Sequence, residues 1–325
     1  MNRLGTGSVR VVALAAVLVL AAAACESSTP AASTAGGKTY TVALAVPLNI
    51  SLFQDEVKGA QAAAKAFGIN LKVSYLATYA EPAYISNIES AIATKPDGII
   101  YGWYSGGYAK VTDEALAAGI KIVFVNGTPH NDANFKTAKY LAIGFASPTE
   151  ADQSATLAQT FLTSLPGHGL VLLVNNAPGQ PDHAIRINTG KAIFEAAGYQ
   201  TDVLNGAEDT ATAVANVSAY LSKHPNVVGA YTTGFNSAQA VCTVSKQDNL
   251  TIPVSTFDAS PTSLAAIKSG CVTVLVDQQF FAEGFFAVAN VYQALRFKTQ
   301  PVEVNTGTYL VTKDNVDSYP TSFAI

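Results

Sequence analysis

The chain alternates short apolar runs with longer segments of helical periodicity, and this pattern restricts its fold more than any other feature. The apolar run Tyr40 to Val46 precedes apolar positions between Phe53 and Phe67 that recur at helical spacing and end at Gly68. A second series begins with the helical segment Thr149 to Leu165 and the apolar run Leu170 to Val174. Strands separated by helices favour right-handed crossovers and parallel sheets. The sequence therefore predicts an α/β fold of two similar Rossmann-like lobes with parallel sheets.

Composition narrows the class of partner. The 325 residues are enough for two domains, and a hydrophobic content of 49% can fill sizeable cores. The formal net charge is -4 and no run of Lys or Arg is present, so we expect no nucleic-acid partner. His130, His168, His183 and His224 show no metal-ligand spacing, and we expect them to be solvated. We predict neither a metal nor a cofactor.

The N-terminal segment, Met1 to Cys25, predicts export. Arg3 and Arg10 precede an apolar run, Val11 to Ala24, that is too short for a membrane span and ends in small residues. The motif LAAAAC, which ends at Cys25, resembles the lipobox of bacterial lipoproteins. We therefore expect Cys25 to be lipidated and to hold the protein to the outer surface of the bacterial cell membrane. The alternative is an ordinary signal peptide cleaved nearby.

Two features of the exported chain follow. Residues 26–38 are rich in Ser, Thr, Ala and Gly and predict a flexible tether between the lipid and the fold. Cys242 and Cys271 form an even pair, which permits a disulfide in an exported protein. Two buried thiols are the open alternative.

The stretch from Val254 to Gly284 carries the clearest site. It reads as a strand, an acidic loop, a short helix, a second strand and the start of a long helix. Asp258 and Gln278 therefore fall just past the carboxyl ends of successive strands, where an open parallel sheet binds small ligands. This stretch resembles the sugar-binding proteins of bacterial ABC importers, the ribose-binding-like (type I periplasmic) family, in its FD at a strand end, its SLAAIKSG helix and its VDQQ.

The resemblance covers nearly everything from Tyr40 to the C-terminus and implies that the chain crosses between lobes three times, near Ala146, Gln278 and Thr306. It predicts an N-terminal lobe of residues 39–146 and 279–305. The C-terminal lobe would comprise residues 147–278 and 306–325. These crossings would form a hinge between the lobes.

The same resemblance implies three polar ligand contacts. Asp258 matches the family's binding Asp and would accept hydrogen bonds from two hydroxyls; the alternative is a cap on the helix at Pro261. Gln278 matches a Gln at a lobe crossing, and its alternative is a hinge residue bonded to backbone. Arg186 matches the family's binding Arg, and the alternative is a surface salt bridge.

Other positions match the family in part. Asn126 and Gly127 stand where ribose binders carry an Asp-Arg pair, which puts ribose itself in doubt. Asn49 and Phe53 match an Asn and a Phe of the first loop, although Ile50 and Leu52 replace two residues that often line the pocket.

Three further side chains are candidates. Gly234 replaces a binding Asn, and Asn236 would supply the lost amide. Trp103, the only Trp, would either form a wall of the cleft or cover the lobe surface. Phe280 and Phe281 are expected on the core side of the long helix, although Phe280 could approach the cleft.

Together these features predict an extracytoplasmic, monomeric solute receptor that captures a neutral sugar or sugar alcohol, with a polyol or a deoxy sugar as candidates, and delivers it to an ABC permease. A sensor or signal-molecule receptor of the same fold is the alternative. A secreted hydrolase is disfavoured, because the sequence has no G-x-S-x-G elbow and no phosphate-binding Gly-rich loop.

Overall fold

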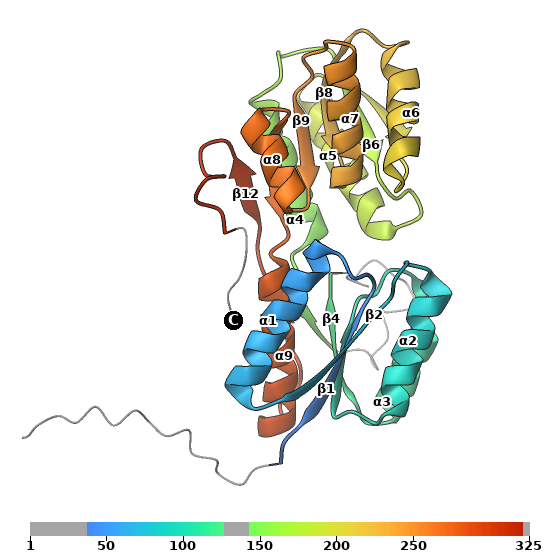
Figure 1. Cartoon of the computed structure of the whole chain (residues 1–325), viewed down its shortest axis with the longest axis vertical. Helices are drawn as coiled ribbons and strands as arrows, with labels where there is room; N and C mark the ends of the chain where they lie inside the picture. Colours follow the sequence, from blue (N-terminus) through green and yellow to red (C-terminus); the bar gives the residue numbers. More distant parts are fainter. Residues whose placement is uncertain (1–37, 127–142, 321–325) are drawn as a thin grey trace, which may run out of the picture. The chain divides into compact units, whose positions relative to one another are not determined.

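The computed structural model describes residues 38–126 and 143–320, shown in Figure 1. The predicted signal segment, Cys25, the tether up to residue 37, Gly127 and His130 lie outside the described residues. The folded unit begins at Thr39. Within the described ranges, no helix is both long enough and apolar enough to cross a membrane.

The first sheet has the strand order β11-β5-β4-β3-β1-β2, and all of its pairings are parallel. Its strands are β1 (Thr41–Val46), β2 (Asn70–Tyr75), β3 (Gly98–Tyr101), β4 (Lys121–Val125), β5 (Gly144–Ala146) and β11 (Glu303–Val304).

Helices cover both faces of this sheet because successive side chains of each strand point to opposite sides. From β1, Leu44 packs with α1 (Ser51–Phe67) and α9 (Phe280–Phe297), while Ala45 packs with α2 (Glu81–Ala93) and α3 (Ala109–Ala117). Figure 1 shows α1 and α9 side by side on one face. A short 3₁₀ helix, η1 (Gly106–Tyr108), precedes α3.

The second sheet has the strand order β12-β10-β9-β8-β6-β7. Its strands are β6 (Leu170–Asn175), β7 (Gln200–Asn205), β8 (Val227–Thr232), β9 (Val254–Phe257), β10 (Val272–Asp277) and β12 (Tyr309–Thr312), of which β12 alone among these is antiparallel to its neighbour.

This sheet is also covered on both faces. One core contains side chains of α6 (Thr210–Leu221), α7 (Phe235–Gln247) and α8 (Pro261–Ser269), and the other contains side chains of α4 (Glu150–Leu162) and α5 (Pro181–Ala196). The predicted α/β fold of two Rossmann-like lobes is confirmed by the two separate, mostly parallel sheets.

The chain passes between the sheets three times. It leaves the first sheet after β5, returns after β10 through α9, and leaves again after β11 to add β12 to the second sheet. The passages thus fall between β5 and α4, between β10 and α9, and between β11 and β12.

Cys242 in α7 and Cys271 just before β10 are joined by a disulfide, with their Cα atoms 5.8 Å apart. The sequence alone did not decide between a disulfide and two buried thiols. The bond ties α7 to the strand that leads to Gln278.

Helices α1 and α9 approach each other closely at two glycines. A Cβ atom on Gly59 would overlap the carbonyl oxygen of Phe281, and one on Gly284 would overlap that of Glu56. This close contact buries the side chains of Glu56 and Glu283, which are 1% and 0% exposed.

Candidate functional site

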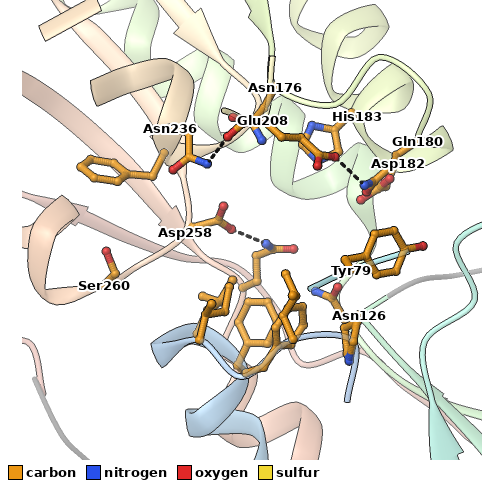
Figure 2. Close-up of a pocket in the computed structure, with 18 of the residues that line it drawn as sticks. Tyr79, Asn126, Asn176, Gln180, Asp182, His183, Glu208, Asn236, Asp258 and Ser260 are labelled. Carbon is orange, nitrogen blue, oxygen red and sulfur yellow. Dashed lines mark hydrogen bonds between the residues drawn. The ribbon is translucent and has the colours of Figure 1, made fainter. Parts of the chain in front are cut away.

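A pocket of about 410 Å³ lies at the carboxyl ends of the strands and is lined by residues from both sheets (Figure 2). Its size falls at the lower end of the range of about 300–1,000 Å³ seen for small-molecule sites, which favours a small ligand over a polymer.

The two sides of the pocket differ in chemistry. Residues from the first sheet and its helices are mainly apolar or aromatic: Pro47, Leu48, Ile50, Leu52, Phe53, Tyr79, Tyr104 and Phe280. Residues from the second sheet and its helices are mainly polar: Asn176, Gln180, Asp182, His183, Arg186, Glu208, Asn236, Gln239, Asp258, Ser260 and Thr262. A ligand with an apolar face and a hydrogen-bonding edge matches this division.

Two rings form the apolar floor of the pocket. Phe53, in the first turn of α1, and Phe280, at the start of α9, meet edge to face with ring centroids 5.5 Å apart. The sequence placed Phe280 mainly in the core. It is buried, yet it also lines the pocket.

Opposite this floor, four side chains form a continuous polar chain, of which Glu150, Arg186 and Gln278 are buried and Asp258 is partly exposed. Arg186 donates from Nε and Nη2 to the two carboxylate oxygens of Glu150, at 2.8 and 3.0 Å. Its Nη2 also donates to Oε1 of Gln278 at 2.9 Å, and Nε2 of Gln278 donates to Oδ1 of Asp258 at 2.6 Å. The amide of Gln278 thus links the guanidinium to the carboxylate.

In this arrangement Arg186 directs four of its five N–H groups to protein acceptors. It is 3% exposed, its Nη1 donates to the carbonyl of Thr233 at 2.8 Å, and its guanidinium lies 4.2 Å from the ring centre of Phe257. The alternative of a surface salt bridge is therefore excluded, since the arginine is buried in a bidentate pair with Glu150.

Asp258 keeps hydrogen-bonding capacity for a ligand because the bond from Gln278 uses only Oδ1. It sits just after β9 with a backbone φ of 77°, a left-handed conformation that Asp tolerates. The alternative role as a helix cap is wrong, because Ser260 caps α8 in a reciprocal capping box with Ser263.

Burial controls the ionisation of this group of side chains. It raises the pKa of Asp258, against the opposing effects of Arg186 and the hydrogen bond from Gln278. It likewise raises the pKa of Glu150, and Arg186 opposes that shift.

His183 belongs to the pocket wall, contrary to the prediction that it is solvated. It is 8% exposed in α5 and its Nδ1 lies 2.7 Å from Oγ1 of Thr233. Burial, followed by the charge of Arg186, holds the pKa of His183 well below its usual value, so the imidazole is neutral near pH 7.

Six of the eight predicted ligand-contact residues line the pocket: Asp258, Gln278, Arg186, Asn126, Phe53 and Asn236. Asn126 accepts a hydrogen bond at Oδ1 from the Tyr104 hydroxyl at 3.2 Å, and Asn236 donates from Nδ2 to the carbonyl of Glu208 at 2.8 Å. Figure 2 shows Asn236 beside Glu208, across from Asn126.

The other two lie elsewhere. Asn49 is exposed and accepts a hydrogen bond at Oδ1 from Gln54 at 3.1 Å. Trp103 is 4% exposed and packs in the core of the first sheet, with ring centroids 5.5 Å from Phe124. It forms neither a pocket wall nor a surface cover.

The sequence missed several lining residues, above all Asp182, Glu208 and Tyr79. Helix α5 begins at Pro181, and this places Asp182 and His183 in its first turn. Pro at the first helical position was the available signal.

Residues 42–299 match the family described as "Periplasmic binding protein domain". A curated relative, the xylose/arabinose-binding protein of Sulfolobus acidocaldarius, is 24% identical over 249 residues, which make up 72% of this chain. The chain spans 61% of that relative's length.

Two solved structures show the same fold. An ABC transporter solute-binding protein from Burkholderia graminis, in complex with D-arabinose, is 24% identical with a TM-score of 0.77, covering 87% of this chain and 98% of that one. A carbohydrate transporter from Acidothermus cellulolyticus, in complex with myo-inositol, is 23% identical with a TM-score of 0.73, covering 86% and 96%.

Proposed function

The chain belongs to the periplasmic binding protein family, and from this premise we propose that it is an extracytoplasmic receptor that captures a neutral sugar or sugar alcohol and delivers it to an ABC permease. The family and its fold are those of binding proteins, so the pocket serves capture and release without chemical conversion of the ligand.

The observation that carries this proposal is the polar chain from Glu150 through Arg186 and Gln278 to Asp258, which ends in a carboxylate facing an aromatic floor. Sugars and polyols present hydroxyl donors along their edges and C–H groups on their faces. A preorganised acceptor opposite aromatic rings fits both.

Each lining residue then has a role. Asp258 accepts hydrogen bonds from hydroxyl groups, Asn126 and Asn236 supply amides from the two sides, and Phe53 contacts the apolar face of the ligand. Gln278 and Arg186 hold the Asp258 carboxylate in place, because their own hydrogen-bonding groups are largely used within the polar chain.

The relatives support a small carbohydrate as the ligand. One is named for xylose and arabinose, and two solved structures hold D-arabinose and myo-inositol. A ligand that touches both sides of the pocket would stabilise the closed arrangement of the two lobes, which a permease can distinguish from the empty receptor.

The location of the receptor also forms part of the proposal. The family is extracytoplasmic, and the motif ending at Cys25 supports lipid attachment at that residue. We place the folded unit as a monomer at the end of the 26–38 tether, outside the cell membrane.

A thermal-shift screen tests this function. Pentoses, hexoses and polyols are added to the protein, and a ligand that binds only the folded state raises the melting temperature by mass action. We expect at least one of them to stabilise the wild type and to lose most of its effect in Asp258→Ala.

The matched control is Asp314→Ala, which removes an exposed aspartate outside the pocket and should keep the shift. No shift with any sugar or polyol, or an unchanged shift in Asp258→Ala, would contradict the proposal.

A further inference from the structure

The pocket holds an excess of negative charge. Among the described residues that line it, the carboxylates are Asp182, Glu208 and Asp258, and the only cationic side chain is Arg186. His183 adds no charge near neutral pH because burial lowers its pKa. The imbalance lies on the second-sheet side, where the polar groups gather.

Arg186 offsets the charge of these carboxylates only in part. Its bidentate partner is Glu150, which is 6% exposed and already balances its charge. Asp182 is farther away, with Oδ2 4.0 Å from Nη2 of the arginine. Asp182, Glu208 and Asp258 therefore share one cation whose charge is largely taken up by Glu150.

Hydrogen bonds hold the side chains of Glu208 and Asn236 in position. Glu208 accepts at Oε1 from Nε2 of Gln180 at 3.2 Å, and its carbonyl accepts from Asn236 at 2.8 Å. Figure 2 shows Glu208, His183, Gln180 and Asp182 gathered on one side of the pocket. The negative charge is thus part of the binding wall, beside the amides that would meet a ligand.

We propose that Asp182 and Glu208 select the ligand by charge: they exclude sugar acids and sugar phosphates and admit neutral or amino-substituted sugars. This inference rests on the proposed sugar-binding function and deepens it. Asp258 is the acceptor for hydroxyls, whereas Asp182 and Glu208 set the sign of charge that the pocket tolerates.

The size of the effect follows from Coulomb's law. A ligand charge about 6 Å from one carboxylate, at an effective dielectric constant of about 40, changes affinity on the order of tenfold. Removing both carboxylates should therefore change the preference between charged and neutral sugars by roughly ten- to a hundredfold. The change should shrink as salt is added, because exposed charges are screened.

The test uses two matched sets: D-galactose, D-galactosamine and D-galacturonate, and D-glucose, D-glucosamine and D-glucuronate. Isothermal titration gives the Kd of each sugar for the wild type, Asp182→Asn, Glu208→Gln and the double variant. Both substitutions keep side-chain size and remove the charge, and each exchanges one acceptor oxygen for an amide donor. Asp314→Asn is the control outside the pocket.

In the double variant we expect the affinity for the uronate, relative to that for the neutral sugar, to rise at least tenfold. The affinity for the amino sugar, relative to that for the neutral sugar, should fall. Neutral-sugar affinity should change far less. Ratios that stay within a factor of two of the wild type overturn the charge selection while leaving sugar binding intact. If neither the wild type nor any variant binds any of the six sugars or any screened pentose or polyol, the proposed function itself fails.

Discussion

Replacing Glu56 by Gln should remove a pH dependence from the stability of the first lobe. Glu56 on α1 and Glu283 on α9 are buried where Gly59 and Gly284 bring the helices together. Within the described residues, Oε1 of Glu56 and both carboxylate oxygens of Glu283 have no hydrogen-bond partner. A buried carboxylate without partners is costly, so the protonated form is favoured.

The sign follows from linkage. Burial raises the pKa of Glu56 from 4.5 to about 8. Burial, followed by the charge of Glu56, raises the pKa of Glu283 well above its usual value. Between pH 4.5 and about 8 the unfolded chain has lost protons that the folded protein keeps, so stability falls as pH rises.

The magnitude comes from the same interval. The interval from pH 4.5 to about 8, at about 1.36 kcal/mol per pH unit, gives a loss of up to about 5 kcal/mol from Glu56 alone. The neighbouring hydroxyls of Tyr75, Tyr84 and Tyr104 also have raised pKa values and stay neutral across this range, so they contribute nothing to the slope.

Urea denaturation at pH 5, 6, 7 and 8 measures the effect. The free energy of unfolding of the wild type should fall with pH more steeply than that of Glu56→Gln, and Glu283→Gln should behave similarly. Glu114→Gln removes an exposed glutamate on α3 and should keep the wild-type slope. Parallel curves for the wild type and Glu56→Gln would refute the reasoning.

Two further perturbations test the fold around the pocket. Arg186→Met should destabilise the protein by about 3–5 kcal/mol because it leaves Glu150 buried without its cation, and adding Glu150→Gln should restore part of that loss. Urea denaturation measures both, and a loss below about 1 kcal/mol in the single variant would show that the pair is not buried as described. Replacing Cys242 and Cys271 together by Ala should cost about 3–4 kcal/mol, since the bond closes a loop with a sequence separation of 29. The same melting temperature with and without reductant in the wild type would contradict this.

The alternation of apolar runs and helical segments was enough to predict the architecture, because periodicity reflects which faces are buried. Asp258 and Gln278 could be placed at one edge of a sheet because they follow the ends of adjacent parallel strands. Their direct hydrogen bond, across 20 positions of sequence, was not predictable, nor was the contact between Arg186 and Gln278 across 92.

Other features depended on local geometry that a sequence pattern does not carry. Trp103 follows β3, and the short helix at Gly106–Tyr108 places Tyr108 beside it in the core, with ring centroids 6.2 Å apart. An aromatic residue in a loop gives no indication of the side to which it turns. Asn49 matched a family pattern, yet its amide oxygen accepts a hydrogen bond from Gln54 in the first turn of α1.

A crystal structure with the sugar or polyol that gives the largest melting shift tests the central claim most directly. We predict the ligand in the pocket, with a hydroxyl within hydrogen-bond distance of Asp258 and its apolar face against Phe53 and Phe280. A ligand bound elsewhere, or one in the pocket that makes no contact with Asp258, would contradict the account.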